Sequence, residues 1–413
     1  MKLIRLFVNE LAEGFKQSKW LPLLTAYAVL SGVIGPGIHF PLIHVPFILL
    51  GFFVAFRSKF KMEISSLLLL LYLPINIIVT QPDGVFNSWM RLELFAIVFV
   101  FASPLFKSQT IAIYRKKILL GVLTISVVLG IGSFLCYFVG INYMSNQATG
   151  EAILDFQGSA GGFGGLFVQS IIFGMVSGLG ALYVFYRSSN QPTKTKKWYY
   201  VMVVVLIMAT LISASRSALL ASVMGMLVML YQMNKKQGKF LRIIMGIVLL
   251  LMITYPLWDG FASGMKQKTE AGAELGAYGS RTEKWMARIS EISSNPVTGI
   301  GFAAVDGHLD IIGAGGVVEP GSSWLCILSM TGIIGFFLFL MILLKPFNYL
   351  RKHPSPYNAL LLGLMAFICM HMISEGYIFA GGSPLCFIAW LIFGCCNDAN
   401  ALKAENDNCR GRV

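Results

Sequence analysis

Charged residues are scarce in this chain of 413 residues: Asp, Glu, Lys and Arg make up 12% of it, about half the share in a typical soluble globular protein. Apolar residues make up 56%, and apolar runs recur from Trp20 almost to the C-terminus. A helix needs roughly 20 such residues to cross a bilayer, and a spanning backbone must satisfy its own hydrogen bonds. The composition therefore predicts an all-α polytopic membrane protein with about twelve transmembrane helices.

Signals for several other classes of protein are missing. The segment from Met1 to Lys19 has no apolar core, so no removable signal peptide is expected. The seven cysteines form no C-x-x-C pair and have no histidine cluster beside them, which argues against disulfides and structural zinc. The glycine-rich string from Gly158 to Gly165 lacks the Lys-Ser/Thr pair of a phosphate-binding loop, so a hinge or lid is expected there. No metal or cofactor is predicted.

The apolar runs define the expected spans, with boundaries that carry an error of several residues. They fall at about 20–35, 38–56, 64–80, 92–106, 118–140, 166–186, 198–214, 217–231, 243–258, 323–344, 358–379 and 384–397.

The basic residues predict the orientation of these spans. With the N-terminus in the cytoplasm, the inner segments hold 25 of the 32 Lys and Arg residues, as expected from the retention of basic residues on the cytoplasmic side. Both termini are then cytoplasmic. The net charge of +13 is explained by inner loops that face anionic lipid, so a nucleic-acid partner is not expected. Seven basic residues remain outside: Arg91, Arg216, Lys266, Lys268, Arg281, Lys284 and Arg288.

The chain is expected to form a single transmembrane domain over residues 1–413, with two long outer loops at 141–165 and 259–322. A loop of that length in a chain with otherwise short connections usually carries function. The second loop is therefore predicted to be the main extracytoplasmic element, with short helices of its own.

A candidate anion site lies at the outer turn Ser213-Ala214-Ser215-Arg216-Ser217. The following span begins there, so its first amides and its dipole would favour an anion. Arg216 adds a guanidinium that can grip two phosphate oxygens, and Ser215 is a candidate cap. The alternative is an interfacial arginine that reaches toward lipid headgroups.

The large loop contains a second basic element. Ser280-Arg281-Thr282-Glu283 fits a capping box and Asn295-Pro296 supplies a stop, which together predict a helix of about fourteen residues. Its face with Arg281, Lys284 and Arg288 is expected to be basic, beside an apolar stripe of Trp285, Ile289 and Ile292. An anionic ligand would explain the basic face, and a helix lying on the outer leaflet is the alternative.

Two further residues are candidates for proton transfer. Glu319 precedes Ser322 and Ser323, either of which could cap the next span, and its carboxylate could accept a proton from a hydroxyl. It could equally favour the positive end of that helix. His308, between Asp306 and Asp310, could titrate near neutrality, although a lone loop histidine is more often simply solvated.

Taken in order, several strings over about 198–345 resemble the O-antigen ligase and O-antigen polymerase superfamily of bacterial envelope glycosyltransferases. The strings are Ser215-Arg216-Ser217-Ala218-Leu219-Leu220, Arg281 with Trp285, Asn295-Pro296 with Gly299-Ile300-Gly301, Glu319-Pro320-Gly321-Ser322-Ser323-Trp324-Leu325 and Thr331-Gly332-Ile333-Ile334-Gly335.

This resemblance implies a GT-C-like fold and an undecaprenyl-diphosphate-linked donor, used without metal at the outer face of the bacterial inner membrane. Arg216 and Arg281 match the arginines thought to hold the diphosphate. Many members carry a histidine where this chain has Gly321, and that histidine is a favoured base in the ligases. Its absence leaves the base open between Glu319 and His308.

We therefore predict a polymerase that extends an O-antigen, capsule or exopolysaccharide by joining lipid-linked repeat units. Candidate partners are the lipid-linked donor and acceptor, the bilayer, a chain-length regulator and a flippase. A ligase and a transporter of lipid-linked sugars are the rivals. The predicted diphosphate-binding residues are Arg216, Arg281, Lys284, Arg288, Ser215, Ser322 and Ser323, and the predicted glycan or lipid contacts are Trp285, Trp324 and Arg91.

Overall fold

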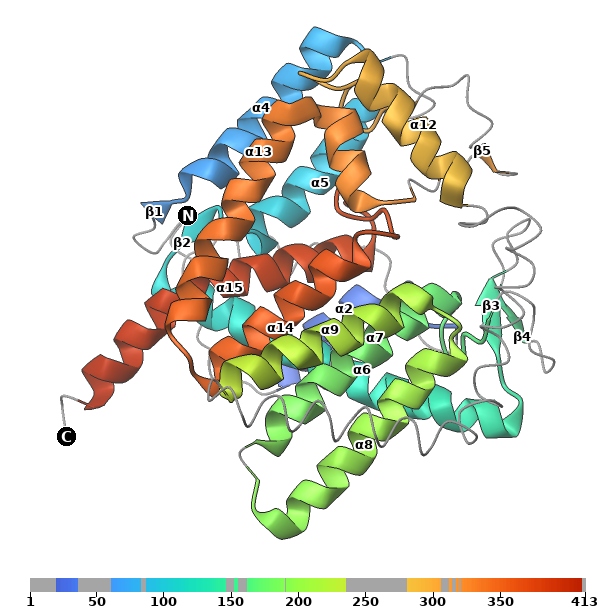
Figure 1. Cartoon of the computed structure of the whole chain (residues 1–413), viewed down its shortest axis with the longest axis vertical. Helices are drawn as coiled ribbons and strands as arrows, with labels where there is room; N and C mark the ends of the chain where they lie inside the picture. The colour runs from blue at the N-terminus through green and yellow to red at the C-terminus, as the bar shows by residue number, and fades with distance from the viewer. Residues whose placement is uncertain are drawn as a thin grey trace, which may run out of the picture.

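The computed structural model describes residues 20–35, 61–82, 87–145, 152–154, 162–189, 191–234, 281–305, 312–313, 317–318 and 321–410. These residues are mainly helical (Figure 1). The helices are α2 (Trp20–Ser31), α4 (Ile64–Thr80), α5 (Ser88–Ala102), α6 (Gln109–Val139), α7 (Ser170–Ser188), α8 (Thr193–Ile212), α9 (Arg216–Met233), α12 (Arg281–Ser294), α13 (Ser323–Lys352), α14 (Pro356–His371) and α15 (Pro384–Arg410).

Short antiparallel strand pairs form at three places in the described part of the chain. They are β1 (Lys61–Met62) with β2 (Phe106–Lys107), β3 (Tyr143–Ser145) with β4 (Ala152–Leu154), and β5 (Ile312–Gly313) with β6 (Val317–Val318). Each pair joins connecting segments, so the strands add no layer to the helical body.

Five helices in the described residues are long and apolar enough to cross a bilayer, and the chain is therefore an integral membrane protein. They are Gln109–Val139, Ser170–Ser188, Thr195–Ile212, Arg216–Met233 and Ser323–Lys352. Helices also occupy the other predicted spans, except for 38–56 and 243–258, which lie outside the described residues.

The glycine string expected to act as a hinge is described only from Gly162 onward. The residues from Gly162 to Gly165 are buried, and the Asn142 side-chain oxygen accepts hydrogen bonds from the backbone N–H groups of Gly164 and Gly165 at 2.9 and 3.1 Å. Such a fixed backbone does not fit the expected hinge. This end of the first outer loop is instead anchored to the end of α6.

The predicted span 323–344 is broken near its first third. Gly332 has non-helical dihedrals (φ 61°, ψ −167°), so α13 consists of a short first part and a longer second part that meet at a sharp kink (Figure 1). The Gly299–Gly301 backbone docks at this kink: the Ile300 and Gly301 N–H groups donate to the Ser329 and Met330 carbonyls at 2.8 and 3.2 Å. Glycine is required at the kink because a side chain at position 332 would collide with the Val297 carbonyl.

The predicted span 358–379 is also shorter than expected. α14 ends at His371, and the segment 372–383 forms turns. The reason is tertiary, since the Ser323 N–H of α13 donates to the Met372 and Glu375 carbonyls at 2.9 and 3.0 Å. The Trp390 indole N–H donates to the Ile378 carbonyl at 2.9 Å. Side chains and helix ends from elsewhere thus fix this segment, which we call the α14–α15 link.

Packing of aromatic rings holds the α14–α15 link against the core. Phe379 meets Phe95 edge-on with ring centroids 5.4 Å apart, and it also contacts Phe302. Trp390 is fully buried and packs edge-on against Phe99, with ring centroids 4.7 Å apart. Such edge-to-face contacts add directional preference to apolar burial. The link is therefore held rigidly beside α5, α13 and α15.

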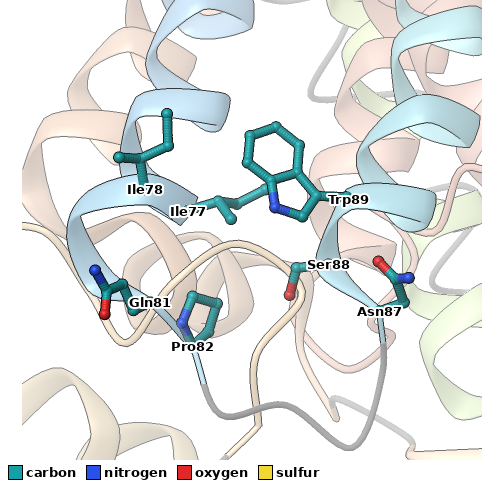
Figure 2. A pocket seen from close by; sticks show the side chains of 7 residues that line it. All are labelled: Ile77, Ile78, Gln81, Pro82, Asn87, Ser88 and Trp89. Carbon is teal, nitrogen blue, oxygen red and sulfur yellow. The ribbon is translucent and has the colours of Figure 1, made fainter.

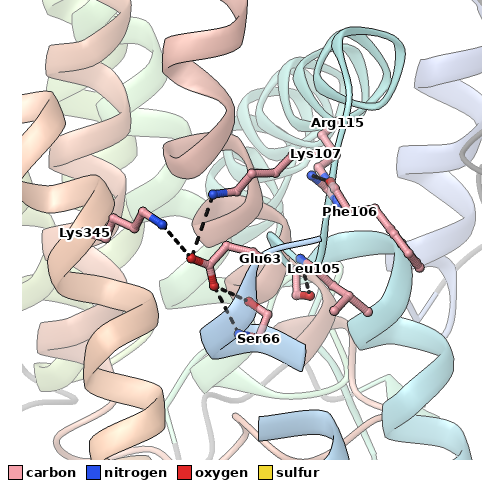
Figure 3. Close-up of polar contacts among 8 residues, drawn as sticks. Glu63, Ser66, Leu105, Phe106, Lys107, Arg115 and Lys345 are labelled. Atoms are coloured by element: carbon pink, nitrogen blue, oxygen red, sulfur yellow. Dashed lines mark hydrogen bonds and ion pairs between the residues drawn. The ribbon is translucent and has the colours of Figure 1, made fainter. Parts of the chain in front are cut away.

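A charged cluster lies at the start of α4 (Figure 3). Glu63 caps this helix by accepting a hydrogen bond from the Ser66 N–H at 3.1 Å, and Lys345 Nζ lies 2.8 Å from the same carboxylate. Burial raises the pKa of Glu63, but the bonds from Lys345 and Ser66 together with the Lys107 charge outweigh it and leave this pKa below its usual value.

At the other end of α4, the Asn76 side chain forms hydrogen bonds with the backbone of Thr298 and Phe302. Segments that the charge pattern predicts on opposite sides of the membrane thus lie at opposite ends of α4.

A buried ion pair joins α6 to α15. Arg115 Nη1 lies 2.9 Å from Asp398 Oδ2, with the two side chains 0% and 2% exposed. The same guanidinium donates to the Phe101 and Phe106 carbonyls at 2.9 and 3.1 Å. A buried charge of this kind depends on its partners, because desolvation is expensive when a partner is lost.

Replacing Asp398 by alanine is expected to destabilise the protein by about 3 kcal/mol, because the Arg115 charge stays buried without its counter-ion. Thermal unfolding of the purified protein in detergent would measure this loss. The matched control replaces both Arg115 and Asp398 by leucine, which removes the charge together with its partner and should cost less than D398A alone. An unchanged melting temperature in D398A would refute the structural role.

Candidate functional site

The outer turn between α8 and α9 forms the helix start that the sequence predicts. Ser215 caps α9, since its Oγ accepts a hydrogen bond from the Ala218 N–H at 3.4 Å. Ala214 adopts a left-handed conformation (φ 52°), which turns the chain sharply before the cap. Arg216 is the first residue of α9 and is exposed. The predicted cap is confirmed, and the cation stands at the positive end of the helix dipole.

The α14–α15 link contributes a buried carboxylate to this helix start. Ser217 Oγ donates to Glu375 Oε1 at 3.2 Å, and the Ser215 and Ser217 hydroxyl oxygens lie 3.3 Å apart. Glu375 is 6% exposed. The hydroxyl groups of Ser215 and Ser217, which flank Arg216, therefore form one hydrogen-bonded chain with the buried Glu375 carboxylate.

The same link also holds the start of α13. Ser323 Oγ donates to the Glu375 carbonyl at 2.6 Å and accepts a hydrogen bond from the Tyr377 N–H at 3.0 Å. Ser322 caps α13 by accepting from the Leu325 N–H at 3.4 Å, so one of the two predicted caps is confirmed. Glu375 thus connects the first turns of α9 and α13, through its side chain to one and its backbone to the other.

Helix α12 brings a third helix start to the same place. The indole N–H of Trp285, one turn into α12, donates to the Gly321 carbonyl just before α13 at 3.2 Å. Figure 1 shows α12 packed along α13, with its first turn on the side where α13 begins. The first turns of α9, α12 and α13 are therefore connected through Glu375 and Gly321. We call these three turns, with the α14–α15 link, the candidate site.

The length of α12 agrees with the sequence, but the predicted faces of this helix are wrong. The fourteen-residue helix ends at Ser294, as Asn295-Pro296 predicted. Arg288 was expected on an open basic face, yet its side chain is 1% exposed and its Nη2 lies 2.7 Å from Glu291 Oε1. Ile289, expected in the apolar stripe, is 45% exposed. The reason is that α13 packs against the side of α12 that carries Ala287, Arg288 and Glu291, so an ion pair fills that interface.

Gly321 occupies the position where many members of the resembling family carry histidine. Its φ is +73°, and a side chain added there would come within 2.9 Å of Lys284 Cβ. A residue with a side chain would be strained in this conformation and would push α12 away from α13. The close contact between the two helix starts therefore suits glycine at this position.

The remaining predicted residues take different places. Trp324 is part of the packing between α13 and α14, where its indole N–H donates to the Cys369 carbonyl at 2.9 Å. Arg91 lies half-buried on α5. Lys284 is partly buried on the first turns of α12. The side chain of Arg281, and both His308 and Glu319, lie outside the described residues.

Glu375 is a residue of the candidate site that the sequence analysis did not single out. The signal that could have found it is its isolation, because Glu375 is the only Asp, Glu, Lys or Arg between Lys352 and Asp398. A single acid at the edge of two apolar spans has few reasons to be there unless it is paired or functional.

The three helix starts of the candidate site are suited to bind an anion next to Arg216. The first amides of a helix lack intrahelical partners, and the helix dipole adds partial positive charge at that end. Three such helix starts lie together here, with an arginine on one of them and a lysine on another. Fixed dipoles and cations of this kind stabilise negative charge that develops on a leaving group. The described residues contain no group of three or more His, Cys, Asp or Glu side chains placed to hold a metal ion.

Comparison with known proteins points to the same part of the chain. A family model described as O-Antigen ligase matches residues 201–340, about a third of the chain. The matched segment includes α9, α12 and the first part of α13, and thus all three helix starts of the candidate site. No curated protein matches the chain. Residues 201–340 are thus similar to the O-Antigen ligase family, and this match supports the resemblance to the O-antigen ligase and O-antigen polymerase superfamily.

Proposed function

We propose that the chain is a polymerase of a bacterial surface polysaccharide such as O-antigen, capsule or exopolysaccharide. It transfers oligosaccharide from an undecaprenyl-diphosphate donor to a sugar hydroxyl of another lipid-linked repeat unit. The reaction takes place at the outer face of the inner membrane, with both termini in the cytoplasm. A flippase that delivers the lipid-linked units and a chain-length regulator are the proposed protein partners.

One observation carries this proposal: Glu375 connects the first turns of α9 and α13, with Arg216 exposed on the former. A diphosphate carries several negative charges in a small volume, and it is matched by an arginine fork beside helix amides. Both helix starts lie within the segment that matches the O-Antigen ligase family. Anion binding at this point is therefore supported by the geometry and by the family match together.

The chemistry assigned to the candidate site is a single displacement. The acceptor hydroxyl oxygen attacks the anomeric carbon of the donor, and the bond between that carbon and the diphosphate oxygen breaks. Undecaprenyl diphosphate leaves with the electron pair, and Arg216 and Arg281 neutralise its charge. The hydroxyl proton goes to a base, for which Glu319 and His308 remain the two candidates. Shielding from water would strengthen each of these electrostatic contacts.

Purified protein in detergent, given lipid-linked repeat units, would test the proposal directly. Polymerisation produces saccharides of two or more repeats that stay attached to the lipid. A transporter would leave every donor molecule covalently unchanged while moving it across vesicles. Absence of elongated product from a folded preparation that does move donor would overturn the enzymatic proposal.

A ligase is the second candidate, because the matching family is described as O-Antigen ligase. Such an enzyme would hand the finished glycan to a lipid or protein acceptor. The same preparation distinguishes the two when it receives long lipid-linked glycan with either repeat units or a lipid core as acceptor. Transfer only to the lipid core would replace the polymerase proposal with the ligase.

Replacing Glu319 by glutamine is expected to slow glycan transfer about 10²-fold while donor binding changes little, since loss of a general base affects the chemical step. Single-turnover kinetics with bound donor would separate the two effects. The parallel variant is His308→Gln, which should be nearly silent if Glu319 is the base. An unchanged rate in E319Q with a slow H308Q would move the base role to His308.

A further inference from the structure

A cavity of about 490 Å³ lies where α4 ends and α5 begins (Figure 2). This volume falls within the range of small-molecule sites in proteins. The residues that line it are Ile77, Ile78, Gln81, Pro82, Asn87, Ser88 and Trp89. We call it the α4–α5 pocket, and the proposed reaction makes no use of it.

One polar group in the α4–α5 pocket has no partner of its own. Ser88 is 6% exposed, and its hydroxyl forms no hydrogen bond with any residue that the structure describes. Buried hydroxyl groups are nearly always hydrogen bonded, because an unsatisfied one costs free energy. A ligand that reaches into this pocket could supply the missing bond.

The rest of the lining indicates the kind of ligand. Figure 2 shows the Trp89 indole facing Ile77 and Ile78 across the pocket, and Trp89 is 47% exposed. Gln81 and Asn87 place carboxamides at the same opening, and all seven lining residues are uncharged. A diphosphate would need cations here, so the lining fits a neutral ligand with both apolar faces and hydroxyl groups. Sugar rings have this combination.

The α4–α5 pocket also lies at the end of α4 where α12 leads into α13. Gly301, in the segment after α12, packs closely against Thr80 and Pro82, and the Asn76 side chain donates to the Thr298 carbonyl at 2.6 Å. The segment that closes the kink of α13 therefore forms a direct contact beside the pocket. A glycan bound there would lie on the same side of the molecule as this segment of the matched family.

We infer that the α4–α5 pocket binds neutral sugar residues of the glycan that the enzyme elongates, with Trp89 against a sugar ring and Ser88 bonded to a sugar hydroxyl. The identity of this glycan as substrate rests on the proposed function, whereas the binding site itself rests on the pocket.

Binding of lipid-free glycan tests this inference without requiring activity. The probe is the oligosaccharide repeat made by the cells that encode the protein, released from its lipid diphosphate by mild acid. Saturation-transfer NMR on purified protein in detergent would report sugar binding. We expect Trp89→Ala to weaken binding about tenfold and Ser88→Ala to weaken it about threefold. Trp198→Ala is the matched control, because Trp198 is a 70% exposed tryptophan at the start of α8, and it should leave binding unchanged.

The outcomes separate this inference from the proposed function. Equal binding by the wild type and the Trp89→Ala and Ser88→Ala variants would overturn the glycan pocket, even if polymerisation by the wild type is normal. If W89A loses sugar binding and the wild type does not polymerise, the glycan pocket is supported and the polymerase proposal is refuted. Ile78, on the rim, is 61% exposed, so a phospholipid is the competing occupant. Co-purified phospholipid that is lost in W89A, without any sugar binding by the wild type, would overturn the inference in favour of lipid.

Discussion

Arg216→Ala is expected to abolish the ladder of long polysaccharide chains and to lower the transfer rate about 10³-fold, while the protein stays inserted and abundant. The residue is exposed at the first position of α9, beside the Ser215 cap, so removing it should cost little stability. Its guanidinium would neutralise charge that appears on the leaving diphosphate, and losses of this size are typical when one preorganised group of that kind is removed. Gel analysis of chain length in cells and single-turnover transfer with purified protein would measure the effect.

Two further variants make the Arg216 result specific. Arg216→Lys keeps the charge but loses the two-pronged contact, so intermediate activity is expected. Arg351→Ala removes another exposed arginine, near the far end of α13, and should leave the ladder intact. Normal chain lengths in both Arg216 variants would remove the diphosphate site from the start of α9.

Within the described residues, the positions of the helices could be predicted well from the sequence, because apolar runs of spanning length have few alternatives to the helix. The ends of the helices were less predictable where tertiary contacts decide them. α14 stops at His371 because Ser323 of α13 bonds to the carbonyls of the link that follows. The kink at Gly332 is equally invisible in an apolar run, since it exists to receive the Gly299–Gly301 backbone.

The candidate site was predictable where it depends on local signals. Ser215 and Ser322 are caps that a short string of residues reveals. The face that α12 buries was predicted wrongly because hydrophobic periodicity assumes an apolar interface. The Arg288–Glu291 ion pair, three residues apart on α12, lies buried in that interface, whereas the spacing predicted Arg288 on an open basic face. The burial of this pair depends on α13, where Ser329 contacts Arg288, and hydrophobic periodicity does not predict it.

The position of Gly321 connects the site to the choice of base. Its left-handed backbone lets α12 approach the start of α13 to the Trp285–Gly321 bond of 3.2 Å. A histidine there would have to displace Lys284. A histidine at position 321 would therefore not fit without a shift of α12, and Glu319 and His308 stay the proposed candidates for the base.

Glu375 is the residue whose change should affect the site most through its neighbours. We expect Glu375→Ala to lower turnover about 10³-fold, because the Ser217 hydroxyl loses its acceptor and the Arg216 turn loses its fixed position relative to α13. The bond from Ser323 goes to the Glu375 backbone carbonyl, which alanine retains, so the link itself should keep its fold. Glu375 is in this view a positioning residue that acts through Ser217.

Different results are expected if Glu375 only stabilises the fold and if it positions Ser217 for the reaction. If Glu375 positions Ser217, Glu375→Gln should recover part of the turnover, because a carboxamide oxygen still accepts the Ser217 hydrogen bond. Ser217→Ala combined with Glu375→Ala should be no worse than Glu375→Ala alone, since the two residues share one interaction. Ile373→Ala, at a 44% exposed position of the same link, should leave turnover unchanged.

Melting temperatures within a few degrees of the wild type, with the loss confined to kcat, would support a positioning role for Glu375. Additive losses from Ser217 and Glu375, or a loss that follows the melting temperature alone, would show that the connection between the two helix starts does not serve the reaction.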